Sequence, residues 1–80
     1  MIEADFEWDA DKADANLAKH GVAFEAATKV FLDAFALEAC DTNSNPLEIR
    51  FIVTGLVNGL LLTVVYTERG ERLRIISARK

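Results

Sequence analysis

The stretch EIRFIVTGLVNGLLLTVVYTERGERLRIISA, residues 48–78, contains three apolar runs separated by two short turn signals. Val, Ile, Leu, Thr and Tyr dominate these runs, and β-branched and aromatic side chains favour strands. Asn58-Gly59 indicates a two-residue hairpin, because a type I′ turn needs positive φ at both central positions. Glu68-Arg69-Gly70 supplies the second turn. The stretch therefore predicts three consecutive antiparallel strands, at about residues 48–56, 60–67 and 71–78.

The hairpin register assigns the side chains of this sheet to two faces. A two-residue Asn58-Gly59 loop pairs Val57 with Leu60, and the pairing continues to Phe51 with Tyr66. One face is then apolar and carries Phe51, Val53, Val57, Leu62, Val64 and Tyr66. The other face carries Arg50, Thr54, Thr63 and Thr67. A two-residue second loop would place Arg72 and Arg74 on the face of Arg50, whereas a three-residue loop with a bulge would reverse them. We prefer the two-residue loop, since it keeps Leu73 and Ile75 on the face that packs against the helices.

The residues before this stretch predict two helices. Asp9 can cap a helix over Ala10–His20, and Gly21 can end it in a left-handed conformation. Apolar residues at helical spacing predict a second helix at about Ala23–Phe31. A weak strand signal at Phe35–Cys40 precedes a loop at 41–46 that is dense in turn residues. We therefore expect an α+β fold in one domain, residues 1–80, with two N-terminal helices packed on one face of a three- to four-stranded antiparallel sheet.

Composition and charge narrow the class of protein. The chain has 80 residues, is 51% hydrophobic and has a net charge of −4. Residues 1–49 carry a balance of −8 and residues 50–80 a balance of +4, which favours an anionic partner for the second half. A single cysteine, no signal peptide and no apolar run long enough for a bilayer predict a cytoplasmic protein without membrane contact.

Basic residues are the first candidate for a functional site. They are Arg50, Arg69, Arg72, Arg74, Arg79 and Lys80, and guanidinium groups match phosphate oxygens bidentately. The alternative is an ordinary solvated face. His20, at a helix end beside Lys19, could transfer a proton near neutral pH, or it could simply partner the helix dipole. Phe6, Trp8 and Tyr66 could stack on bases, or they could belong to the core.

Other kinds of site find little support. The acidic residues between Glu3 and Asp14 indicate a solvent-exposed face, where the positive end of the helix dipole favours negative charge. Cys40 is expected to be a small buried apolar residue. The sequence offers no His/Cys cluster for zinc, no glycine loop for phosphates and no Ser-His-Asp arrangement. We therefore expect neither a metal nor a cofactor.

Five motifs in this order resemble the BrnT-type toxin family: FEWD, KxxxNxxKHGVxF, ExRF, VVYTERG and RIISARK. The resemblance covers Phe6 to Lys80. It implies a RelE-like ribonuclease fold, membership of a type II toxin–antitoxin pair and metal-free RNA cleavage. It also implies a BrnA-type antitoxin partner, whose ribbon-helix-helix portion binds operator DNA. The matching positions are Trp8, Lys12, Asn16, Lys19, His20, Gly21, Glu48, Arg50, Tyr66, Arg69, Arg74, Ser77 and Arg79.

The resemblance and the chemistry of RNA cleavage together suggest roles for these residues. His20 would transfer the proton, and the phosphoryl charge would be stabilised by Arg50, Arg72 or Arg74, and Arg79. The expected RNA-binding residues are Trp8, Lys12, Lys19, Tyr66, Arg69, Arg74 and Lys80. Family members usually continue past RIISARK into a basic helix, whereas this sequence stops at Lys80. A weakened toxin that only binds its antitoxin and aids repression is therefore the alternative function, and a homodimer is a further expected partner arrangement.

Overall fold

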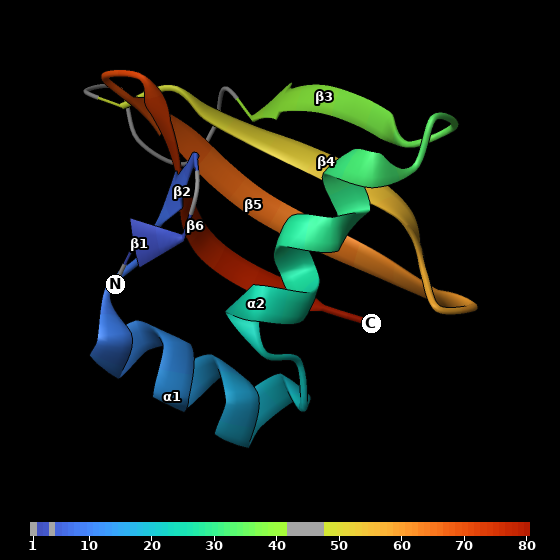
Figure 1. Ribbon diagram of the computed structural model, residues 1–80, viewed down its shortest axis with the longest axis horizontal. Coiled ribbons are helices and arrows are strands. Elements are labelled where there is room, and N and C mark those ends of the chain that lie inside the picture. The colour runs from blue at the N-terminus through green and yellow to red at the C-terminus, as the bar shows by residue number, and fades with distance from the viewer. Residues whose placement is uncertain (1, 4, 42–47) are drawn as a thin grey trace.

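The computed structural model describes residues 2–3, 5–41 and 48–80, and it arranges them around a six-stranded sheet (Figure 1). The order of strands across the sheet is β1-β2-β6-β5-β4-β3. The elements are β1 (Ile2–Glu3), β2 (Phe6–Glu7), α1 (Ala10–His20), α2 (Phe24–Ala27), the 3₁₀ helix η1 (Thr28–Leu32), β3 (Leu37–Asp41), β4 (Arg50–Val57), β5 (Leu60–Arg69) and β6 (Arg72–Arg79). Of the loop expected at 41–46, Asp41 ends β3 and the rest lies outside the described residues.

The three strands predicted from residues 48–78 are confirmed. Asn58 and Gly59 have φ of 51° and 82°, as a type I′ turn requires, and Phe51 pairs with Tyr66. The second loop consists of Gly70 and Glu71, one residue later than expected, and Gly70 takes a φ of 60°. This change moves the pairing by two residues, which preserves the faces, so Arg72 and Arg74 share the face of Arg50.

The prediction of three or four antiparallel strands is wrong in two respects. The N-terminal segment adds β1 and β2, and β2 pairs in parallel with β6, so the sheet is mixed. The backbone N–H of Leu73 also donates to the carbonyl of Asp5 at 2.8 Å. Strands of two residues are too short to show an alternating pattern, which is why the sequence gives no sign of them.

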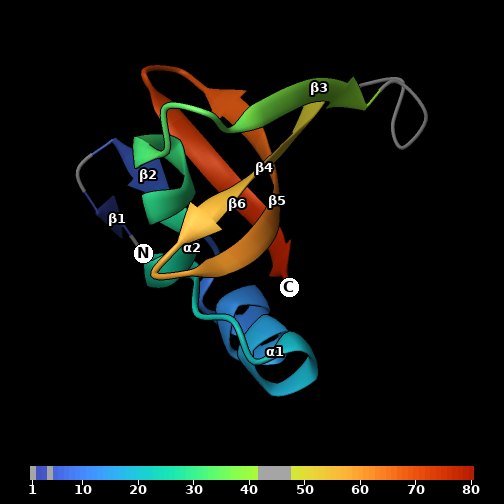
Figure 2. The same ribbon diagram turned by 90° about the vertical axis from the view of Figure 1, so that its right-hand side faces the viewer.

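Helix α1 begins and ends where the sequence predicts, but it does not lie on the sheet face. The carboxylate of Asp9 accepts from the backbone of Asp11 and Lys12, and Gly21 ends the helix with a φ of 71°. The helix lies alongside β6 (Figures 1 and 2). Asn16 connects the two: its Oδ1 accepts from the N–H of Ala78 at 3.1 Å, and its Nδ2 donates to the carbonyl of Ala78 at 2.8 Å. The backbone N–H and carbonyl of Ala78, at the edge of β6, thus bond to a side chain and not to another strand.

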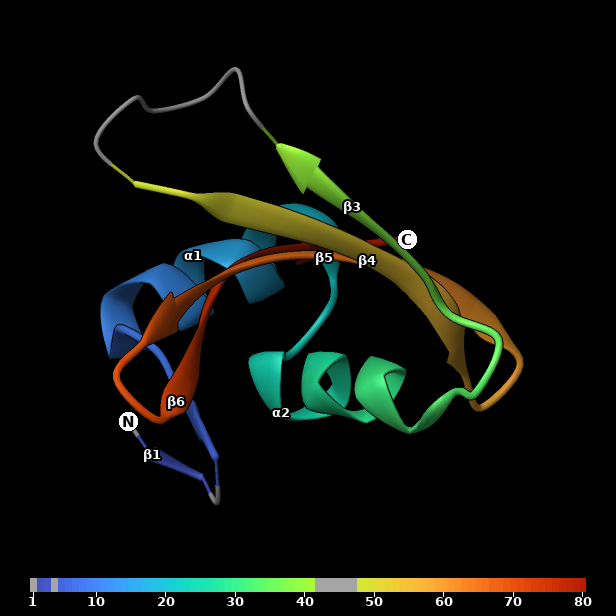
Figure 3. The ribbon, with the colours of Figure 1, turned by 90° about the horizontal axis from the view of Figure 1, so that it is seen from above.

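The core lies between the sheet and the segment formed by α2 and η1, which sits under the concave side of the sheet (Figure 3). The single second helix that the sequence predicts is instead divided into these two short pieces. Its N-terminus has no side-chain cap, because Ala23 cannot accept a hydrogen bond. The predicted apolar sheet face is confirmed, since Val53, Val57, Leu62, Val64 and Tyr66 are all buried. The burial expected for Cys40 is wrong: it is exposed on β3.

Candidate functional site

The sheet face turned away from α2, called the open face here, gathers arginines at one end. Arg50, Thr67 and Arg74 form one row across β4, β5 and β6. Arg69 and Arg72 form the next row, two residues further along. We call Arg50, Arg69, Arg72 and Arg74 the arginine patch. Like charges directly opposite each other on neighbouring strands repel, so this arrangement favours an anion that binds between them.

Two carboxylates hold part of the arginine patch in place. The Nε of Arg50 is 3.0 Å from Oε1 of Glu48, and Nη1 of Arg74 is 3.0 Å from Oε2 of Glu7. Both arginine side chains keep more than a quarter of their surface exposed. In the part of the chain that the structure describes, Arg69 and Arg72 have no carboxylate within 4.0 Å. Asp41 on β3 lies directly opposite Arg50, so the four arginines are accompanied by the carboxylates of Glu7, Glu48 and Asp41 and still outnumber them.

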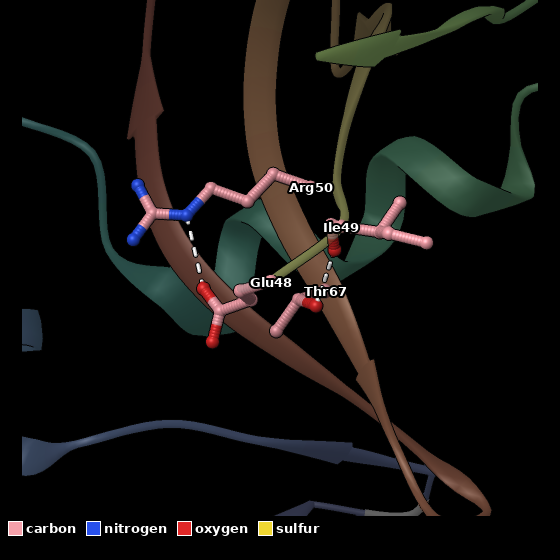
Figure 4. A network of polar contacts seen from close by, with 4 residues as sticks. All are labelled: Glu48, Ile49, Arg50 and Thr67. Carbon is pink, nitrogen blue, oxygen red and sulfur yellow. Dashed lines mark hydrogen bonds and ion pairs between the residues drawn. The ribbon is translucent and has the colours of Figure 1, made fainter. Parts of the chain in front are cut away.

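A buried threonine supports the segment that carries Glu48 and Arg50. Thr67 is only 4% exposed, and its hydroxyl donates to the carbonyl of Ile49 at 2.6 Å (Figure 4). This bond fixes the backbone between Glu48 and Arg50 against β5. Beside it lies a shallow hollow of about 450 Å³, lined by Glu48, Ile49, Phe51, Thr67, Glu68 and Arg69. Two carboxylates, those of Glu48 and Glu68, and the guanidinium of Arg69 thus line one recess on the surface.

The structure separates His20 from this patch. Because Asn16 binds Ala78, α1 and β6 end at the same end of the molecule, where Gly21 and Lys80 line one hollow. Four strand residues separate Ala78 from Arg74, or roughly 13 Å at about 3.3 Å per residue, and His20 lies one helical turn beyond Asn16. His20 therefore cannot share one phosphate with Arg50, Arg72 and Arg74.

The remaining predicted cations, outside the arginine patch, are exposed. Arg79 lies on the open face in the row of Thr63, four residues along β5 from the row of Arg50. Lys19 and Lys80 are exposed at the same end of the molecule as His20, and Lys12 is exposed near the start of α1. The predicted catalytic residues are thus divided: Arg50 and Arg72 lie in the arginine patch, whereas His20 and Arg79 lie toward the other end of β6.

The two aromatic residues expected to contact RNA are in the core. Trp8 is 3% exposed and packs edge-on against Phe24, with 6.0 Å between ring centroids. Tyr66 is 5% exposed between Phe31 and Phe51. Burial is the main reason that the pKa of Tyr66 is raised, and a hydrogen bond with Glu38 adds to it. Neither ring is accessible to a base in this structure. Both rings belong to the core, which was the alternative that the sequence left open.

Sequence reasoning named Glu48 only as a position that matches the family and gave it no role, and it did not single out Glu7 as a site residue. Glu48 precedes Arg50 by two residues in extended chain, and this spacing on one side of a strand was an available signal. Glu7 gave no such signal, because it meets Arg74 only through the parallel pairing of β2 with β6.

The described residues form neither a metal-ligand cluster nor a membrane-spanning helix. No three or more His, Cys, Asp or Glu side chains among them are grouped as metal ligands. None of the helices there has the length and apolarity needed to cross a bilayer.

Comparison with known proteins identifies the family. The family model for the ribonuclease toxin BrnT of type II toxin–antitoxin systems matches residues 8–80, which include α1, the whole arginine patch and every strand from β3 to β6. A search of curated proteins finds no match. The family match spans most of the chain and agrees with the resemblance noted in the sequence. The chain therefore belongs to the BrnT family of ribonuclease toxins of type II toxin–antitoxin systems.

Proposed function

We propose that this chain is an endoribonuclease toxin that cleaves RNA without a metal ion, and that the arginine patch holds the scissile phosphate. The observation that carries the proposal is the set of four arginines on one sheet face, of which Arg69 and Arg72 form no ion pair with a carboxylate of the described residues. Guanidinium groups donate two parallel hydrogen bonds to phosphate oxygens and keep their charge at any relevant pH. Family membership supplies the reaction class.

In this reaction the 2′-oxygen of a ribose attacks the neighbouring phosphorus, and the bond from phosphorus to the 5′-oxygen breaks. A base must take the proton of the 2′-hydroxyl, and the leaving 5′-oxygen must receive one, here from solvent. The arginines would stabilise the charge that develops on the phosphoryl oxygens. The products would be a 2′,3′-cyclic phosphate and a free 5′-hydroxyl.

We assign the base to Glu48 rather than to His20. Its carboxylate contacts Arg50 at 3.0 Å and is a third exposed, so a phosphate bound by Arg50 would bring its ribose close to Glu48. His20 lies toward the far end of β6, the end that carries Arg79 and Lys80. There, these residues and Lys19 would bind the backbone of the same RNA several nucleotides away. The sequence suggested that His20 transfers a proton, whereas we propose that it binds RNA.

An oligoribonucleotide incubated with the purified chain in EDTA would test this assignment. Glu48→Gln keeps the shape of the side chain and removes the base, and we expect a loss of about 10²–10⁴-fold in cleavage rate. Arg72→Ala should lower the rate by weakening charge stabilisation. His20→Ala should weaken RNA binding and leave the rate at saturating RNA nearly unchanged. Glu25→Gln, on the exposed surface of α2, is the matched control.

Two results would contradict the proposal. If Glu48→Gln cleaves at the wild-type rate while His20→Ala is inactive, the reaction takes place at the end of α1. If an oligonucleotide with 2′-deoxyribose at every position is cleaved as well, the 2′-hydroxyl is not the nucleophile.

Membership of a type II toxin–antitoxin family implies that the partner of this chain is an antitoxin. We propose a BrnA-type antitoxin that neutralises the toxin and contacts operator DNA through its own ribbon-helix-helix portion, so that DNA is reached only through the antitoxin. The toxin would inhibit translation by cutting RNA. Expressing the chain should slow bacterial growth, and co-expressing the protein encoded by the neighbouring gene should restore it. Binding of that protein without any RNA cleavage would instead favour the alternative of a non-catalytic corepressor module.

A further inference from the structure

The open face continues beyond the arginine patch as an aliphatic surface. Leu56 and Leu61 are opposite each other on β4 and β5, and both keep more than half of their surface exposed. Leu37 on β3, 77% exposed, pairs with Thr54 in the next row. Ile52 pairs with Val65 two rows before the leucine pair, directly beside the row of Arg50. We call Leu37, Ile52, Leu56, Leu61 and Val65 the aliphatic strip.

The strip is not covered within the part of the chain that the structure describes. Segment α2–η1 packs under the other face, and α1 lies beside β6 (Figures 2 and 3). Within the strip, the row of Thr54 and Thr63, whose hydroxyls are 3.2 Å apart, separates the Ile52–Val65 pair from the Leu56–Leu61 pair. Exposed apolar surface on a folded protein commonly marks a site of protein–protein contact. It suits a polypeptide better than RNA, because unpaired bases bind to aromatic rings. The described residues of the open face include none.

The charge of the open face indicates further which kind of molecule would bind there. The strip leads directly into the arginine patch, where Arg69 and Arg72 form no ion pair with any carboxylate that the structure describes. From Leu56 to Arg50 is six residues, or roughly 20 Å at about 3.3 Å per residue. A helix of about 13 residues has that length at 1.5 Å per residue. A second copy of this chain fits poorly, because two open faces packed together would bury arginines against arginines or against leucines.

We infer that the open face is the docking surface for the antitoxin, and that the docking segment carries aliphatic side chains over the strip and carboxylates over the arginine patch. The inference rests on the proposed function in one respect, since it makes the antitoxin and RNA compete for the same guanidinium groups. Neutralisation would then be direct: the acidic end of the segment occupies the positions of the phosphates. The strip would supply affinity that RNA cannot use.

The test separates the two halves of the open face. The probe is the antitoxin encoded by the neighbouring gene, titrated calorimetrically into the chain in the absence of RNA. The double variant Leu56→Lys/Leu61→Lys should lose at least about tenfold in affinity for the antitoxin, since it removes apolar area that binding would bury and places two charges there instead. It should still cleave RNA at the wild-type rate. Arg72→Ala should weaken both antitoxin binding and cleavage.

Leu60→Lys is the matched control. Leu60 is adjacent to Leu61 on β5 and 52% exposed, but it pairs with Val57 and therefore points to the opposite face. This variant should bind the antitoxin as the wild type does. Melting temperatures of all variants, followed by circular dichroism, verify that they are folded.

Three outcomes would overturn the inference. The first is wild-type antitoxin affinity in the folded double variant, and the second is an equal loss in Leu60→Lys. The third is a homodimer of the isolated chain, seen by light scattering, that the double substitution dissociates. If the wild type cleaves no RNA but the double variant still loses the antitoxin, the proposed function fails and the docking surface remains.

Discussion

Asn16 should be the single most important polar residue for the stability of this fold. Its amide makes three hydrogen bonds: Nδ2 donates to Val22 O at 3.0 Å and to Ala78 O at 2.8 Å, and Oδ1 accepts from Ala78 N at 3.1 Å. Asn16→Ala would leave three largely buried backbone groups without a partner, at about 1–3 kcal/mol each. The better helix propensity of alanine returns less than about 0.7 kcal/mol. Partial entry of water favours the lower end, so we expect a loss of about 3–5 kcal/mol.

This loss is large for a chain of 80 residues, whose total stability at about 0.05–0.15 kcal/mol per residue is about 4–12 kcal/mol. Urea denaturation of the wild type and the variant measures it directly. Amide hydrogen exchange at Ala78 should accelerate in the variant even where the domain stays folded. Asn16→Asp keeps the acceptor for Ala78 N but points a carboxylate at two carbonyls, so it should destabilise the fold as well.

Lys12→Ala, on the exposed side of the same helix, is the control and should change the free energy of unfolding by less than about 0.5 kcal/mol. The reasoning would be refuted if Asn16→Ala unfolded at the same urea concentration as this control. It would also be refuted if exchange at Ala78 were unchanged, since α1 would then be held against β6 by something other than this amide.

Three further predictions concern the core and its edge. Gly55→Ala should lower the free energy of unfolding by about 1–3 kcal/mol in urea denaturation, because a Cβ there would lie 2.9 Å from Val30. The carboxylate of Asp33 accepts a hydrogen bond from the backbone N–H of Leu56 at 2.8 Å, and this bond lowers the pKa of Asp33 below the ordinary 3.8. The variant Asp33→Ala should therefore be less stable than the wild type above about pH 4. The melting curves of the two proteins should converge as the pH falls below the pKa of Asp33 in the folded state. Burial raises the pKa of Tyr66, so ultraviolet absorbance should detect no phenolate near pH 10 while the chain stays folded, and ionisation there would contradict its place in the core.

Local signals in the sequence determined much of the fold. Asn58-Gly59 set the first hairpin, because few other residue pairs accept positive φ twice in succession, and the register of β4 and β5 follows from it. Asp9 and Gly21 fixed both ends of α1 through their own backbone conformations and hydrogen bonds. The shared face of Arg50, Arg72 and Arg74 could also be predicted, since alternation along a strand has a period of two.

Only the tertiary structure decided which of these residues meet. The parallel pairing of β2 with β6 brings Glu7 to Arg74 across most of the chain, and two residues of strand carry no pattern that could announce it. The contact of Asn16 with Ala78 directs α1 along β6, and so places His20 away from Arg50, Arg72 and Arg74, which it was expected to join. Sequence patterns report periodicity and turn chemistry, which act over a few residues. The position of a helix beside a sheet depends on contacts between residues far apart in the chain, and a single sequence does not display them.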